Sequence, residues 1–127
     1  MESHIPYEHI VKRACDFIIK YRFYSEQEGG RKTGTPSQGY RSDFMYSEDE
    51  ENNSLWIIWP EFLDVNGNVI IDKTINVDAN GKAQMWIINK DLIEKHNSRI
   101  RIGQKGYLME GNKKVAECEV LEIINLI

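Results

Sequence analysis

A loop-like stretch in the first third of the chain carries three closely spaced basic side chains. The segment EGGRKTGTPSQGYRSDF, residues 28–44, places Arg31, Lys32 and Arg41 among glycines, a proline and hydroxyl residues. This composition disfavours a helix and predicts a loop. Guanidinium and ammonium groups bind phosphate and carboxylate oxygens through charge-assisted hydrogen bonds. The loop is therefore a candidate surface for an anionic partner.

A run of acidic residues follows this loop. Segment 47–53, SEDEENN, contains four consecutive carboxylates, Glu48, Asp49, Glu50 and Glu51. No lysine or arginine occurs between Ser42 and Asp72, so the chain changes from a mainly basic stretch to an acidic one. Such a run is typical of a solvated turn, and it would also suit a basic protein partner.

The sequence lacks the common catalytic and metal-binding patterns. Segment GGRKTG does not have the spacing of a phosphate-binding P-loop. His4, His9 and His96 are scattered, and no cysteine or histidine pair has the spacing of a zinc site. Neither Cys15 nor Cys118 has a histidine close in sequence that could activate its thiol. We therefore expect a protein that is not an enzyme and that uses no metal, nucleotide or other cofactor.

Composition indicates one soluble globular domain over residues 1–127. With 41% hydrophobic and 28% charged residues, the chain has enough apolar side chains for a core. No apolar run approaches the ~18 residues of a membrane-spanning helix. The N-terminus shows no signal-peptide pattern, so we predict a cytoplasmic protein with free, buried cysteines. The net charge of −4 argues against promiscuous nucleic-acid binding.

Alternating apolar residues predict mostly strands. Phe17, Ile19, Tyr21 and Phe23 alternate with more polar positions, which predicts a strand with one buried face. Further strands are expected at residues 40–47, 54–64, 83–87, 106–109 and 115–123. Two short helices are expected at residues 6–13 and 90–96, the first in an N-terminal extension of residues 1–14 that covers one end of the core.

Turn residues separate these strands. Asn66-Gly67, Asn80-Gly81 and Gly111-Asn112 predict three turns. Pro60 lacks a ladder donor, so its segment is expected to be an edge strand or to end there. The aromatic residues of the central strands favour core packing over a role as base-stacking platforms. These are Trp56, Trp59, Phe62 and Trp86.

Two motifs resemble the third domain of bacterial elongation factor Tu, a six-stranded β-barrel. The first is an EGGR-x-T loop followed by GYR-x-x-F, and the second is a glycine turn between the last two strands. The resemblance covers residues 17–46 and 100–124. The matching residues are Glu28, Gly29, Gly30, Arg31, Thr33, Gly39, Tyr40, Arg41, Phe44, Gly103, Tyr107, Leu108, Glu110, Gly111 and Val115.

The resemblance implies an all-β fold, a small closed six-stranded antiparallel barrel with one or two short helices. It implies no GTPase activity, because the nucleotide-binding domain has no counterpart here. In the family this barrel contacts the backbone of a tRNA stem and faces protein partners. The positions that match the RNA-facing surface are Arg31, Lys32, Arg41, Glu110 and Gly111. Asp43 and Met109 depart from the family. Asp43 stands in place of a glutamine and would repel phosphate, and Met109 stands in place of an arginine and carries no charge.

Two functions remain open at this point. The first is a non-enzymatic module that binds a tRNA-like RNA stem or a translation-associated protein through the basic loop. The second is a protein-interaction module, such as a small inhibitor or immunity-type protein, that uses the acidic segment with Glu48 to Glu51. On the first alternative, we expect Arg31 and Arg41 to lie near each other on one rim of the barrel.

Overall fold

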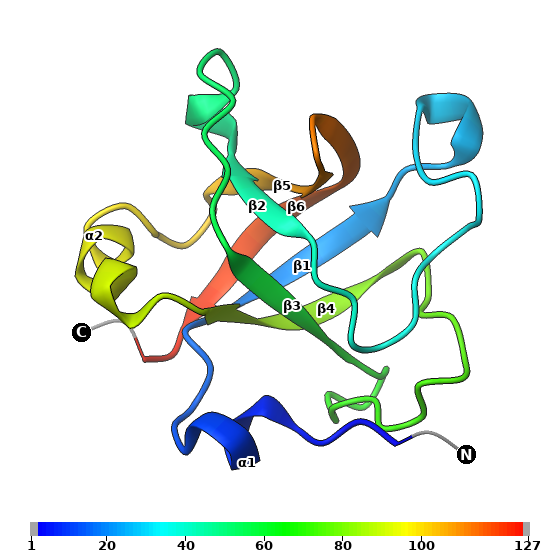
Figure 1. Cartoon of the computed structure of the whole chain (residues 1–127), viewed down its shortest axis with the longest axis horizontal. Helices are drawn as coiled ribbons and strands as arrows, with labels where there is room; N and C mark the ends of the chain where they lie inside the picture. Colours follow the sequence, from blue (N-terminus) through cyan, green and yellow to red (C-terminus); the bar gives the residue numbers. More distant parts are fainter. Residues whose placement is uncertain (1–2, 126–127) are drawn as a thin grey trace.

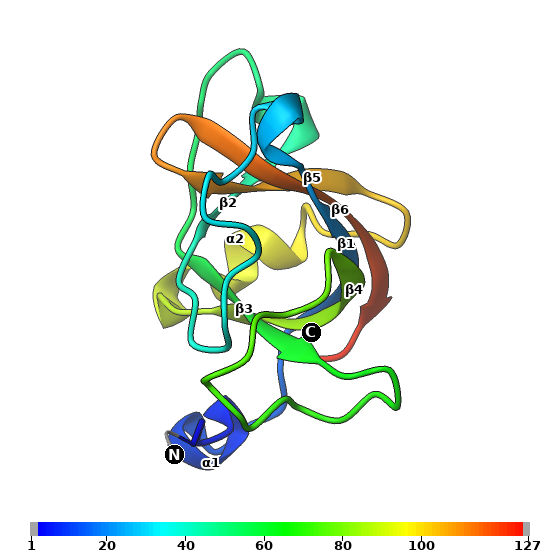
Figure 2. The same cartoon turned by 90° about the vertical axis from the view of Figure 1, so that its right-hand side faces the viewer.

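Six antiparallel strands form one strongly curved sheet, in the order β2-β5-β6-β1-β4-β3 (Figures 1 and 2). The computed structural model describes residues 3–125. The strands are β1 (Phe17–Phe23), β2 (Asp43–Tyr46), β3 (Ile58–Leu63), β4 (Asn80–Ile87), β5 (Lys105–Glu110) and β6 (Lys113–Ile123). The short helices are α1 (Tyr7–Val11) and α2 (Ile93–Asn97), with single 3-10 turns η1 (Glu26–Glu28), η2 (Ser47–Asp49) and η3 (Lys90–Leu92). No helix in the described range is long and apolar enough to cross a membrane.

The sheet is an open half-barrel, so the predicted closed barrel is wrong. Across the gap between the edge strands β2 and β3, Phe44 and Trp56 exchange two backbone hydrogen bonds of 2.9 Å. Trp56 lies before the start of β3, and this contact is an isolated bridge. Closure requires a ladder that continues around the whole barrel. Among the described residues, the four-residue strand β2 instead pairs along its length with β5 alone, and the contact on its other edge is limited to this bridge.

The predicted alternation is confirmed in β1 and β4. In β1, Phe17 and Ile19 are fully buried, and Tyr21 and Phe23 nearly so. In β4, the alternating Ala83, Met85 and Ile87 are buried in the same way. These side chains share one hydrophobic core with residues from every other strand. The concave side of the sheet therefore holds the core.

Two turn predictions and the edge-strand prediction are confirmed. Pro60 lies in β3, whose one strand neighbour in the described range is β4 and which forms one edge of the sheet. Gly67 has a φ of 84° in the turn after β3, and Gly111 has a φ of 60° between β5 and β6. Glycine adopts this left-handed backbone conformation at little cost, which explains its presence in both turns.

The predicted turn at Asn80-Gly81 is wrong, because both residues belong to β4 and pair with β1. Gly81 serves a close approach instead. A Cβ at this position would lie 2.8 Å from the hydroxyl oxygen of Tyr21, which packs across it. The chain between β3 and β4 is a long connection, residues 64–79, and this segment forms a lobe beside the sheet (Figure 2).

Helix α1 packs on the outside of the sheet through one side chain. Helix α1 lies inside the predicted range, but Ile10 is 60% exposed and Val11 is exposed as well. The expectation that its apolar residues cover the core is therefore wrong. Tyr7 provides the contact, because its ring meets Trp86 edge-on at 5.9 Å and lies 6.4 Å from Trp59. The second predicted helix, residues 90–96, forms as η3 followed by α2.

The core predicts a large loss of stability when an aromatic side chain is removed. Phe17 is fully buried and packs edge-on against Phe44. We expect Phe17→Ala to lower the free energy of unfolding by about 3 to 5 kcal/mol, measured by urea denaturation. The control Ile102→Ala, at a 68% exposed position, should change it by less than about 0.5 kcal/mol. Equal effects of the two substitutions would contradict this core.

Candidate functional site

The arginine of the glycine loop is held by the β5–β6 hairpin. Arg31 donates from Nε to Glu110 at 2.8 Å and from Nη1 to the carbonyl oxygen of Gly34 at 2.7 Å. Its guanidinium lies 5.1 Å from the centre of the Tyr40 ring. The Tyr40 hydroxyl donates to the same Glu110 oxygen, and burial followed by this carboxylate raises the pKa of Tyr40. The structure thus brings together Arg31, Glu110 and the adjoining Gly111.

This arrangement compensates the charge of Arg31. Its side chain is only 21% exposed, and the Glu110 carboxylate already neutralises it. An ion pair of this kind fastens a loop, because its two partners are 79 residues apart in the chain. The arginine therefore positions the loop against the hairpin.

The other two basic residues of the loop have different surroundings. Arg41 is exposed, and its guanidinium lies 4.3 Å from the centre of the Trp59 ring. Lys32 is exposed next to Arg31. Arg31 and Arg41 therefore contact different aromatic side chains and share no partner among these contacts.

The acidic run is bound to basic side chains from the second half of the chain. Asp49 receives two hydrogen bonds from Arg99, at 3.0 and 3.1 Å, which lower the pKa of its carboxyl group. Glu50 pairs with Lys114 at 2.8 Å, and this hydrogen bond lowers the pKa of Glu50.

The neighbouring Glu48 accepts from Gln104 at 2.5 Å and lies 3.9 Å from Arg101. Glu51 is exposed. Three of the four predicted acidic contact residues thus have partners inside the protein. Much of the charge of the run is therefore already compensated inside the protein.

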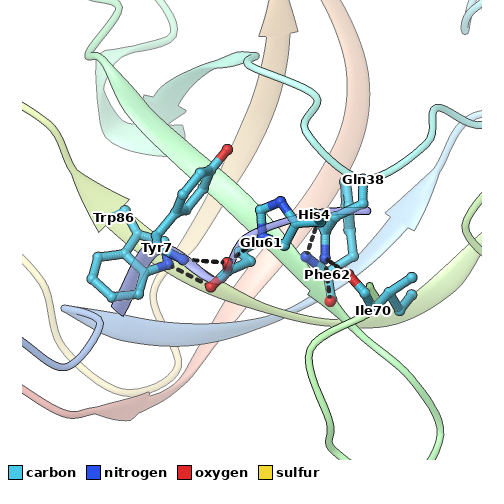
Figure 3. Close-up of polar contacts among 7 residues, drawn as sticks. All are labelled: His4, Tyr7, Gln38, Glu61, Phe62, Ile70 and Trp86. Atoms are coloured by element: carbon cyan, nitrogen blue, oxygen red, sulfur yellow. Dashed lines mark hydrogen bonds and ion pairs between the residues drawn. The ribbon is translucent and has the colours of Figure 1, made fainter. Parts of the chain in front are cut away.

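A buried glutamate that we did not predict organises the outer side of the sheet (Figure 3). Glu61 in β3 is fully buried. It accepts from Trp86 Nε1 at 3.0 Å and from the Tyr7 backbone N–H at 2.8 Å, and its carboxyl oxygen Oε2 lies 2.5 Å from His4 Nε2. Because it alternates with Pro60 and Phe62 in the strand, Glu61 faces outward, and the strand pattern alone does not predict that it is buried. Its burial results from the N-terminal segment, which has no sequence signal for this contact.

A buried glutamine fastens the loop to the same strand. Gln38 Nε2 donates to the carbonyl oxygens of Phe62 and Ile70, both at 2.9 Å, and Gln38 Oε1 accepts from the Phe62 N–H at 2.8 Å (Figure 3). These bonds supply the loop with the backbone pairing that it lacks. The basic loop is therefore fixed at both its ends, by Gln38 and by Arg31.

The two thiols are unsuited to nucleophilic chemistry. Cys15 and Cys118 are free and buried. Burial raises the pKa of each to about 12, and nearby carboxylates contribute in the same direction. At neutral pH both are protonated, whereas the thiolate is the reactive form. Within residues 3–125, no three His, Cys, Asp or Glu side chains come together to hold a metal ion.

An apolar groove with an acidic rim lies beside the connection of residues 64–79. Its volume is about 800 Å³, and it also borders β1 and β4. Val65 is 91% exposed, Ile75 49% and Ile71 43%, and all three line it. Its carboxylates are Asp64, Asp72 and Asp78. We did not predict this groove from the sequence, although VNGNVIID combines exposed turn residues with aliphatic ones.

Backbone contacts fix the groove relative to the N-terminal segment. The His4 N–H donates to the Ile71 carbonyl oxygen at 2.7 Å, and Ser3 pairs with Asp72 in an isolated bridge. Figure 1 shows the blue N-terminal segment beside this green connection at the bottom of the molecule. Hydrogen bonds from Thr74 lower the pKa of Asp72, so this carboxylate is ionised at neutral pH.

Comparison with known proteins identifies no family for the chain. No protein-family model matches the sequence, and no curated protein matches it either. The site must therefore be interpreted from its own chemistry.

A buried histidine predicts how stability depends on pH. His96 is 1% exposed, with Nδ1 2.6 Å from the Tyr46 hydroxyl. Burial, with the charges of Arg99 and Lys95, lowers its pKa from 6.5 to about 4. As pH falls, His96 is therefore protonated at a higher pH in the unfolded chain than in the folded protein. Between pH 6.5 and about 4 the free energy of unfolding should decrease by on the order of 3 kcal/mol from this residue.

The measurement is chemical denaturation across this pH range. His96→Gln should flatten the slope of stability against pH, even if the variant is less stable at pH 7. The exposed His9→Gln variant serves as the control and should keep the wild-type slope. An unchanged slope in His96→Gln would contradict the assignment.

Proposed function

We propose that this chain is a non-enzymatic binding module that docks a protein partner in the apolar groove beside residues 64–79. The observation that carries this proposal is the exposure of Val65, Ile71 and Ile75 around one hollow. Exposed aliphatic side chains scattered singly are ordinary, but a contiguous apolar patch with a polar rim is characteristic of an interaction site. The protonated, buried thiols support a non-enzymatic role.

The groove also selects the chemistry of its partner. Asp64, Asp72 and Asp78 line it together with a single cation, Lys82. We expect a partner segment with aliphatic side chains and neighbouring basic residues. It would bury its aliphatic side chains in the groove and pair its basic residues with the aspartates. This proposal keeps the protein-interaction alternative but moves its site. The acidic run of Glu48 to Glu51 is a weaker candidate, because a partner would have to displace Arg99 and Lys114 from it.

Quantitative capture from an extract of the native host tests this proposal. Wild-type protein should retain a specific protein, and Ile71→Asp with Ile75→Asp should lose it, because each aspartate would bring an unpaired charge into an apolar contact. Ile102→Asp, exposed outside the groove, is the matched control and should retain it. Loss in the control, or retention in the groove variant, would refute docking at this site.

A second candidate is contact with the backbone of an RNA stem, as the resemblance to the elongation factor Tu barrel implies. Lys32 and Arg41 support it, because both side chains are exposed on the loop that matches the family. On this proposal they contact phosphates directly. Arg31, Glu110 and Gly111 contribute by holding the loop against the hairpin.

Fluorescence anisotropy with a tRNA-like stem over a salt series tests the RNA candidate. Each phosphate contact should add a log-log slope of roughly −0.7 to −0.9. Lys32→Ala and Arg41→Ala should each reduce the slope by about one contact, whereas Lys90→Ala, outside the loop, should not. Asp43→Gln should strengthen binding by removing a carboxylate from β2. If the wild-type protein does not bind even at low salt, the RNA candidate fails.

A further inference from the structure

A row of lysines crosses the outer face of the sheet next to the groove. The strand registers place Lys82 opposite Lys20, Lys20 opposite Glu119, and Glu119 opposite Lys105. All three lysines are exposed. Lys20 and Glu119 form one loose ion pair, with 3.8 Å between Nζ and Oε1. Like charges directly opposite each other destabilise a strand pair. The row therefore holds more positive charge than its single glutamate compensates.

The lysine row and the acidic groove form one continuous surface. Lys82 itself lines the groove. Tyr21 and Asn80 line both the groove and a shallow hollow of about 360 Å³ that Lys20 and Lys105 border. Glu117 and Glu119 also border this hollow, and Glu117 is paired with Arg22. The acidic groove thus adjoins a surface on which Lys20, Lys82 and Lys105 outnumber Glu119. The surface carries charge of both signs, in separate halves.

We infer that the partner docked in the groove is a second copy of this chain, related to the first by a two-fold axis. This inference rests on the protein-docking function proposed above and names its partner. In a two-fold interface the same patch faces itself in reverse, so each contact occurs twice. The lysine row of one copy then meets the aspartates of its partner, and the reverse contact forms at the same time. Three lysines, Lys20, Lys82 and Lys105, face three aspartates, Asp64, Asp72 and Asp78.

The apolar part of the patch supplies the attraction between the copies. Val65, Ile71 and Ile75 lie among the aspartates, and a two-fold contact would bury them against the equivalent residues or against the stems of the lysines. Lysine stems are apolar over four carbons and cover aliphatic surface while their ammonium groups reach the rim. The net charge of −4 opposes association of two copies. The dimer therefore depends on local pairing of opposite charges, which makes it sensitive to charge reversal.

Sedimentation equilibrium over a wide concentration range tests the inference. Wild-type protein should shift from a mass of 14.8 kDa to twice that value as concentration rises to the millimolar range. Lys20→Glu with Lys82→Glu should weaken association by more than about tenfold, because it sets glutamates against aspartates. Asn76→Lys with Asp78→Lys should weaken it similarly by setting lysines against lysines. Lys90→Glu with Lys113→Glu has the same charge change as the first variant and should associate as the wild type does.

Mixing the two charge-reversed variants provides the decisive measurement. In the mixed pair, the glutamates of the first variant face the introduced lysines of the second. The native lysines of the second variant face the native aspartates of the first. Both contacts therefore attract. The mixture should therefore recover dimerisation that neither variant shows alone. This recovery also shows that each variant is folded.

Three results would overturn the inference: a wild-type protein that stays monomeric at all concentrations, a lysine variant that associates normally, or a mixture that fails to recover. A monomeric wild type that still captures a protein through Ile71 and Ile75 would leave the proposed docking function intact and exclude only the second copy as its partner. Failure of both experiments would exclude the function as well.

Discussion

The fully buried carboxyl group of Glu61 is the constraint that organises one whole side of this protein. A buried acidic group is costly unless hydrogen bonds satisfy it, and Glu61 has three polar partners. Two come from the N-terminal segment and one from β4, so the acid holds together parts of the chain that are far apart in sequence. Removing these partners would leave an unpaired polar group inside the protein. The N-terminal segment is thereby fixed to the outer face of β3 and β4.

The consequences of this attachment reach the proposed docking site. His4 binds Glu61 through its ring and Ile71 through its backbone N–H, so one residue links the buried acid to the groove. Ile71 therefore lies at the surface on a segment whose backbone is hydrogen-bonded to the N-terminal segment. Exposed aliphatic side chains on a fixed backbone lose less conformational freedom on binding than those on a free loop. The long connection of residues 64–79 is thus better suited to docking than its length alone would indicate.

Local sequence patterns predicted the elements, and long-range contacts escaped prediction. The alternation in β1, the glycine turns and the edge position of Pro60 each depend on neighbouring residues, so the sequence contained the information. Gly81 was misread because a glycine can serve a turn or a close approach, and only the position of Tyr21 distinguishes the two. Barrel closure depends on how far β2 and β3 overlap across the gap, which no local pattern encodes.

Long-range pairing also decides which charges remain available to a partner, and for this reason the proposed docking site differs from the predicted one. Arg31 and the carboxylates Asp49 and Glu50 were chosen correctly as charged surface residues, but each is paired inside the protein with a residue at least 50 positions away. An external partner must break those pairs before it gains its own, so the net attraction is small. The sequence did not single out Lys20 and Lys82, because a lysine on the outer face of a strand is usually solvated. Only the strand register sets them opposite each other, and repulsion that folding leaves uncompensated is relieved when an acidic surface binds. On the proposed docking function, binding energy comes from the charge and aliphatic surface that folding leaves unpaired beside the groove.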